Sequence, residues 1–160
     1  MGTVATIEEI KQVREEARGQ GRKVVFTNGC FDVLHRGHVE YLAQARELGD
    51  LLIVGVNSDA SVRALKGEGR PVVGEEDRAA VLAALGCVDW VVIFDDASVA
   101  GLVEEVLPDV LAKGGDYTLE GIVGREAVEA AGGRVVAVAS SVPQASSSEI
   151  IRKMGEERGE

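Results

Sequence analysis

The chain has 160 residues, of which 17 are basic and 27 acidic, so its formal net charge is −10. This length suits one domain with a proper core. Proteins that bind nucleic acid through counterion release usually show the opposite charge balance, which argues against DNA or RNA as a partner. The two cysteines, Cys30 and Cys87, are far apart and favour free thiols over a disulfide framework or a zinc site.

The first residues lack the basic and apolar regions of a signal peptide, and no apolar run approaches the length of a membrane span. We therefore expect a cytoplasmic protein that does not enter a membrane. Hydrophobic residues make up 46% of the chain and aromatic residues only 4%. Such a composition, rich in Val, Ala and Leu, is typical of α/β proteins.

The first predicted element is a helix that begins at Thr6, which has capping-box spacing to Glu9, and ends at Gly19 or Gly21. Apolar runs then alternate with helical periodicity as far as residue 154. Residues 66–74, KGEGRPVVG, have no periodicity and predict a loop. Strands are predicted within 23–29, 51–57, 88–94, 109–116 and 134–140, and further helices within 38–50, 58–65, 75–86, 97–107, 125–133 and 146–154.

Strands that alternate with helices pair in parallel through right-handed crossovers. The pattern predicts a doubly wound, Rossmann-like α/β fold, with one parallel five-stranded sheet and helices on both faces. We expect a single domain over residues 1–154, and a flexible tail over residues 155–160.

Three polar segments follow predicted strands: residues 28–38, 57–59 and 113–116. In doubly wound sheets, ligands bind outside the carboxyl ends of the strands. These segments are therefore expected to meet at one edge of the sheet and to form a site.

Both histidines of the chain, His35 and His38, lie in the first of these segments, NGCFDVLHRGH. Two histidines at this spacing could bind a metal ion, and Asp32 is close in the sequence. A full set of ligands is nevertheless hard to find, because no other histidine exists and the cysteines are poorly placed. They could also lie in a solvated turn with no function. The segment lacks the GxGxxG pattern of dinucleotide-binding domains, which argues against an NAD site.

Phosphate binding explains the segment better. A strand that ends at Gly29, followed by a turn and a helix near Gly37 and His38, directs backbone amides and the positive end of the helix dipole toward the site. Imidazole donors would add to this, and Gly37 lets the backbone approach a ligand closely. The segment therefore favours phosphoryl chemistry.

The HRGH stretch resembles the HxGH signature of the nucleotidyltransferase superfamily, which includes the cytidylyltransferases and pantetheine-phosphate adenylyltransferase. The second signature of that superfamily, an ISSTxxR-like start of a helix, has its counterpart in residues 145–153, ASSSEIIRK. Residues 23–153 as a whole look like the adenylyltransferase domain of bacterial ADP-heptose synthesis, which is often fused to a sugar kinase. The chain resembles a stand-alone form of that domain.

The resemblance implies transfer of AMP from ATP to a sugar 1-phosphate, D-glycero-D-manno-heptose 1-phosphate above all, by direct in-line attack and with release of pyrophosphate. A cytidylyltransferase acting on glycerol 3-phosphate or another alcohol phosphate, or a nucleotide-binding module without catalysis, stays an alternative. The catalytic residues that the resemblance implies are His35, His38 and Lys66. The nucleotide-binding residues that it implies are Asn28, Gly29, Phe31, Gly37, His38, Lys113, Gly115, Asp116, Ser146, Ser147 and Ser148.

The resemblance also implies substrate binding by Asp32, Lys66, Arg70 and Arg78. Three of these have simpler alternatives. Asp32 could bond only to local amides, Lys66 could be a solvated loop residue, and Arg78 could pair with neighbouring acids. The serines could likewise act only as a helix N-cap.

The chain departs from the ISSTxxR pattern at one position. Three residues after Ser148 stands Ile151, and Arg152 follows one step later, about 100° further round a helix. An apolar residue at this position agrees with the heptose branch and leaves the role of Arg152 open. Another cation, Arg36 or Lys66, would then have to supply the positive charge that the motif places there.

No metal-binding cluster is evident, and Mg²⁺ is expected to arrive with ATP, held by phosphates and water. A homodimer is common among the relatives that the resemblance names.

Overall fold

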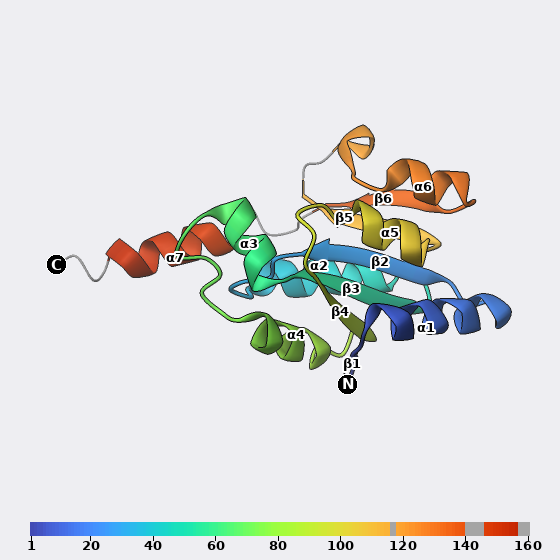
Figure 1. Cartoon of the computed structure of the whole chain (residues 1–160), viewed down its shortest axis with the longest axis horizontal. Coiled ribbons are helices and arrows are strands. Elements are labelled where there is room, and N and C mark those ends of the chain that lie inside the picture. The colour runs from blue at the N-terminus through green and yellow to red at the C-terminus, as the bar shows by residue number, and fades with distance from the viewer. Residues whose placement is uncertain (116–117, 140–145, 157–160) are drawn as a thin grey trace.

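The computed structural model describes residues 1–115, 118–139 and 146–156, and its centre is one parallel sheet of six strands (Figure 1). The strand order is β1-β4-β3-β2-β5-β6. Among the described residues, no helix is both long and apolar enough to span a membrane. The strands are β1 (Thr3–Val4), β2 (Val24–Gly29), β3 (Leu51–Asn57), β4 (Trp90–Phe94), β5 (Val110–Gly114) and β6 (Arg134–Val138).

Helices cover both faces of the sheet, as predicted. Successive strand residues point to opposite faces, so Val24 and Phe26 join one apolar cluster and Val25 joins the other. The first cluster receives α1 (Ile7–Gly19), α5 (Ala100–Val106) and α6 (Arg125–Ala130); the second receives α2 (Arg36–Arg46) and α4 (Glu75–Ala83). The remaining helical elements are α3 (Asp59–Lys66), the single turn η1 (Leu119–Gly121) and α7 (Ser147–Glu156).

The predicted count of five strands is wrong, because β1 adds a sixth at the edge of the sheet. Thr3 and Val4 are exposed, and they pair with Trp90 and Val91 of β4. Two residues are too few to show a hydrophobic period, so the pattern could not reveal this strand. Backbone hydrogen bonds hold it, including one from the Thr3 amide to the Asp89 carbonyl at 3.0 Å.

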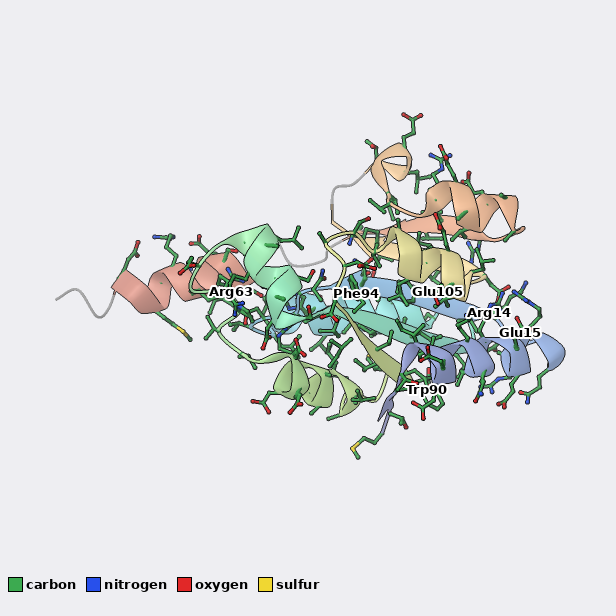
Figure 2. The ribbon with its side chains drawn as sticks, viewed as in Figure 1. Arg14, Glu15, Arg63, Trp90, Phe94 and Glu105 are labelled. Atoms are coloured by element: carbon green, nitrogen blue, oxygen red, sulfur yellow. The ribbon has the colours of Figure 1, made fainter. Side chains whose placement is uncertain are left out.

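The predicted capping box opens α1, since the Thr6 hydroxyl accepts from the Glu9 amide and the Glu9 carboxylate accepts from the Thr6 amide. The same helix is tied to the start of β5. Figure 2 labels Arg14, whose buried guanidinium donates to both carboxylate oxygens of Asp109 at 3.0 and 3.1 Å. It also donates to the Leu107 carbonyl at 2.9 Å. This bidentate pair fixes α1 against the sheet.

The order of the strands reverses beside β2, and this reversal creates the crevice of the fold. From β2 the chain runs through α2 to β3 and β4 on one side, and then crosses through α5 to β5 on the other side of β2. The segments that leave β2 and β5 therefore part at the carboxyl edge. Such a switch point is where open α/β sheets bind ligands.

Candidate active site

A cavity of about 480 Å³ opens at this switch point. Its size lies within the range of small-molecule sites. The two signature segments, far apart in the chain, both border it, as do the ends of β2 and β5. The residues that line it are Asn28, Gly29, Cys30, Phe31, Asp32, His35, Gly37, His38, Tyr41, Lys66, Arg70, Lys113, Gly114, Gly115, Ser146, Ser147 and Ser148.

The two histidines build the start of α2. His35 is the N-cap, and its Nδ1 accepts the Gly37 amide at 3.1 Å. His38 reaches back, so that its Nδ1 accepts the His35 amide at 3.4 Å. A neutral ring whose Nδ1 accepts a hydrogen bond carries its proton on Nε2. Both imidazoles therefore keep an Nε2–H donor. The Gly37 amide, which the sequence pattern directs at a ligand, is instead engaged by His35.

The histidine rings are packed together, with centroids 4.0 Å apart, and His38 also lies 5.4 Å from the ring of Phe31. Burial lowers the pKa of His35. Burial, followed by the nearby charge of His35, lowers the pKa of His38 to about 4. His38 is therefore neutral near pH 7, in the form that has one donor and one acceptor nitrogen.

The low pKa of His38 predicts a loss of stability in mild acid. The unfolded imidazole titrates near pH 6.5, so below this value the unfolded chain binds a proton that the folded chain rejects. The contribution of His38 is complete above about pH 6.5 and is lost as the pH falls toward 4. In urea unfolding, the free energy of the wild type should fall about 1–2 kcal/mol more than that of His38→Gln between about pH 7 and pH 4.5, after allowance for partial exposure. Equal slopes in the two proteins would contradict the prediction.

Among the described residues, three cations and one carboxylate line the cavity, so this part of the lining is positive within an acidic protein. Lys66 ends α3 and is exposed, whereas Lys113 comes from the end of β5. Burial lowers the pKa of the Lys113 ammonium, an effect that neighbouring Cys30 partly offsets. Arg70 lies in the loop between α3 and α4. Compact ammonium groups and a planar guanidinium at one cavity are suited to phosphate oxygens.

Each of the three serines around the start of α7 has a distinct contact. Ser146 caps the helix, which was the simpler alternative for these serines, since its hydroxyl accepts the Glu149 amide at 3.1 Å. The Ser147 hydroxyl donates to the Val33 carbonyl at 2.7 Å, and the Ser148 hydroxyl accepts from Arg70 at 3.3 Å. These contacts bring the start of α7 against the histidine turn. The two signature segments, 114 residues apart at the Ser147–Val33 bond, thus share one wall of the cavity.

Asp32 and Arg78, two predicted substrate-binding residues, are both buried in contacts within the protein. Asp32 accepts hydrogen bonds from Arg70 and from the amides of Val72 and Val73. Arg78 is 2% exposed and is not among the residues that line the cavity. These contacts correspond to the simpler alternatives given above: Asp32 bonds to backbone amides, and Arg78 pairs with an acidic residue, Asp59.

Arg78 joins four separate segments below the cavity. Its guanidinium donates to the carbonyls of Val73 at 2.8 Å, Cys30 at 2.6 Å and Asn57 at 2.7 Å. It also pairs with Asp59 at 2.8 Å. The ends of β2 and β3, the start of α3 and the loop before α4 are therefore held by one side chain.

Tyr41 lies outside the segments that the sequence predicts for the site, and Cys30 and Gly114 lie within them, yet all three line the cavity. The Tyr41 hydroxyl bonds to Thr27 and donates to the Ala112 carbonyl at 3.2 Å, and burial raises its pKa to about 12. A Cβ at Gly114 would lie 3.1 Å from the Tyr41 ring. The spacing of Tyr41, three residues after His38 on a helix, was the signal that could have found it.

A second cavity of about 530 Å³ adjoins the first, and the two share five lining residues, Asn28, Gly29, Cys30, Lys66 and Lys113. Its other walls come from the end of β3, the segment after β4 and the segment around η1. The remaining residues that line it are Asn57, Leu65, Ala97, Ser98, Val99, Gly121, Ile122 and Val123.

Metal ligands are scarce at this site. Within residues 1–115, 118–139 and 146–156, no cluster of three or more His, Cys, Asp or Glu is placed to hold a metal ion. The predicted nucleotide-binding residue Asp116 lies outside the described residues. The cations, imidazoles and hydroxyls of the cavity are suited to anions, and thus to a metal that arrives already bound to phosphates.

A Rossmann-like sheet with a histidine turn and a cationic cavity at its switch point fits the nucleotidyltransferase class that the sequence resembles. The family comparison agrees, since residues 26–153 match the model of the cytidylyltransferase-like family. The chain belongs to the cytidylyltransferase-like family.

Individual proteins of known sequence or structure are similar to this chain. The chain is 58% identical over 143 residues to "Bifunctional protein HldE" of Geobacter sulfurreducens, and 57% identical over 140 residues to the protein of that name from Pelobacter propionicus. These matches cover 89% and 88% of the chain but only 29% and 28% of those proteins. A solved structure, the lipopolysaccharide core biosynthesis protein from Thermoplasma volcanium, is 30% identical with a TM-score of 0.61, over 76% of this chain and 98% of that one.

Proposed function

We propose that the protein transfers AMP from ATP to D-glycero-D-manno-heptose 1-phosphate and releases pyrophosphate. A phosphate oxygen of the sugar phosphate attacks the α-phosphorus of ATP in line, and the bond from that phosphorus to the bridging oxygen of pyrophosphate breaks. No covalent intermediate with the protein forms. The enzyme's part is therefore to position two anions and to stabilise the charge that develops between them.

The observation that carries this proposal is the single cavity that both signature segments border. His35, His38 and the serines at the start of α7 lie around it with Lys66, Arg70 and Lys113. A site for a sugar or a nucleoside alone needs no such set of cations. The relatives named HldE support a heptose phosphate as the acceptor.

In this proposal the two imidazoles act as neutral donors. Their Nε2–H groups donate hydrogen bonds to oxygens of the triphosphate. These bonds strengthen as negative charge develops around the α-phosphorus in the transition state. Lys113 and Arg70 neutralise the phosphates, and the hydroxyls of Ser147 and Ser148 exchange their present partners for phosphate oxygens. Asn28, Gly29, Phe31, Gly37 and Gly115 line the nucleotide's side, and Asp116 is proposed to approach its ribose or base.

The second cavity is the proposed site of the sugar phosphate. An in-line attack needs the acceptor on the side of the α-phosphorus opposite to the leaving pyrophosphate. Two adjoining cavities that share Lys66 and Lys113 support this placement of the two substrates. Lys66, at the end of α3, would then contact both the attacking phosphate and the α-phosphate. Lys66 is accordingly assigned to catalysis as well as to substrate binding.

The proposed cofactor is Mg²⁺, bound through the phosphates of ATP and through water, since it keeps much of its hydration shell. When bound it would screen the negative charge of the triphosphate. We place the reaction in the cytoplasm, where ATP is present. We also expect a homodimer, which analytical ultracentrifugation would measure.

A panel of substrates tests the proposal. Purified protein with Mg²⁺ is combined with each of four nucleoside triphosphates and with several phosphates, among them D-glycero-D-manno-heptose 1-phosphate and glycerol 3-phosphate, and pyrophosphate release is measured. We expect ATP with the heptose phosphate to give the highest kcat/KM. Preference for CTP with glycerol 3-phosphate would replace the proposal with a cytidylyltransferase. Binding of ATP without turnover of any pair would instead indicate a nucleotide-binding module.

A further inference from the structure

Asp32 lies at the centre of the contacts that hold the loop between α3 and α4. The residue is only 3% exposed. Its Oδ1 accepts from the backbone amides of Val72 at 2.8 Å and Val73 at 2.9 Å. Its Oδ2 accepts from Arg70 Nε at 2.6 Å and also from the Val72 amide at 3.0 Å.

These contacts fill the hydrogen-bond acceptor positions of the Asp32 carboxylate. A carboxylate offers about four acceptor positions, and both oxygens of Asp32 already accept from two donors each. Burial alone would raise its pKa, but the amides of Val73 and Val72 and the guanidinium of Arg70 together bring the pKa below its usual value. The charged carboxylate is therefore satisfied by donors within the protein.

The loop that Asp32 holds has contacts on two further sides. Arg78 Nε donates to the Val73 carbonyl at 2.8 Å, so Val73 is bonded through both its amide and its carbonyl. Arg70 Nη1 donates to the Ser148 hydroxyl at the start of α7, at 3.3 Å. Because a guanidinium has five N–H donors, these bonds leave donors of Arg70 for a phosphate. Before Arg70, the loop contains two glycines with positive φ, Gly67 at 93° and Gly69 at 83°.

We propose that Asp32 is a positioning residue, which fastens residues 70–73 to the histidine turn and thereby holds Arg70 at the cavity. Asp32 itself does not touch substrate. The inference rests on the proposed function, since the placement of Arg70 affects turnover only if the cavity binds phosphates. It also assigns separate tasks to neighbours in the sequence: His35 and His38 contact the ligand, and Asp32 orders the loop above them.

Limited proteolysis tests the fastening without any substrate. Asp32→Asn replaces one acceptor oxygen with an NH₂ group that faces N–H donors, so the loop should open. Trypsin can then cut after Lys66, whereas the proline after Arg70 protects the following bond. We expect cleavage after Lys66 to be about tenfold faster in Asp32→Asn than in the wild type, as followed by mass spectrometry.

Asp77→Asn is the matched control, because it makes the same substitution at an exposed position in the first turn of α4, away from the bond after Lys66. It should be cut at the wild-type rate. If circular dichroism shows Asp32→Asn to be unfolded, Arg70→Gln takes its place, since it removes the other half of the same ion pair. An unchanged cleavage rate in a folded Asp32→Asn protein overturns the proposal.

A double-mutant cycle separates positioning from direct contact with substrate. The kcat/KM for ATP is measured in Asp32→Asn, in Arg70→Gln and in the double variant. If Asp32 acts through Arg70, the double variant should be within about threefold of the more impaired single variant. If Asp32 contacts substrate or its metal directly, the two losses multiply, which would overturn the proposal. Failure of the wild type to turn over any substrate would refute the proposed function, while the proteolysis result would still decide the role of Asp32.

Discussion

His38→Ala is expected to lower kcat for pyrophosphate release by about 10²–10³ while ATP still binds. The reason is that its Nε2–H donor is proposed to be most useful at the transition state, when charge gathers on the α-phosphate, and the loss of one such donor typically has this size. The ring is held ready for this task by the His35 amide at its Nδ1 and by ring contacts with His35 and Phe31. No reorganisation is then needed at the moment of reaction.

The experiment compares kcat at saturating ATP with the affinity for ATP measured by calorimetry. Val39→Ala is the matched control, since Val39 follows His38 on α2, is 42% exposed and does not line the cavity. Its kcat should stay at the wild-type value. A kcat within threefold of the wild type in His38→Ala would remove His38 from the catalytic residues.

Arg78→Met is expected to lower the free energy of unfolding by about 3–5 kcal/mol. Methionine fills much of the volume of arginine but donates no hydrogen bond. The Asn57 carbonyl would lose a donor in a buried place and the carbonyls of Val73 and Cys30 in part-buried places, and Asp59 would lose its partner. Because the guanidinium meets several acceptors at once, Arg78→Lys should recover only a minor part of the loss.

Urea unfolding followed by circular dichroism measures this effect. Arg63→Met provides the control, because Arg63, labelled on α3 in Figure 2, is an exposed residue. It should change the free energy of unfolding by no more than about 0.5 kcal/mol. A loss below about 1 kcal/mol in Arg78→Met would show that the carbonyls find water instead, and that Arg78 is available for a ligand.

Much of the fold followed from local patterns in the chain. Strands buried on both faces read as continuous apolar runs, so LLIVGVN and WVVIF could be recognised without any partner. The helix start at Thr6 carried its own capping signal. The edge strand β1 had no such signal, because two exposed residues pair only where the start of β4 offers its backbone.

The sequence predicted which residues would border the cavity where those residues lie at or after the carboxyl ends of strands. His35, Lys113 and Ser147 border one cavity because parallel strands deliver their loops to one edge of the sheet. The contacts of Asp32 and Arg78 were not predictable in the same way. Each was assigned to substrate from its type and its place in a motif, and neither property says which acceptor or donor lies within reach.

The sequence by itself determined the α/β architecture, the histidine turn and the signature at the last helix, since hydrophobic period, capping and motif spacing all act over a few residues. Only the tertiary structure decided which charged side chains line the cavity and which hold the protein together. Arg78 meets the carbonyls of Cys30 and Asn57, 48 and 21 residues away along the chain. A buried guanidinium must satisfy its donors wherever the fold brings acceptors close, and that depends on the packing of distant segments.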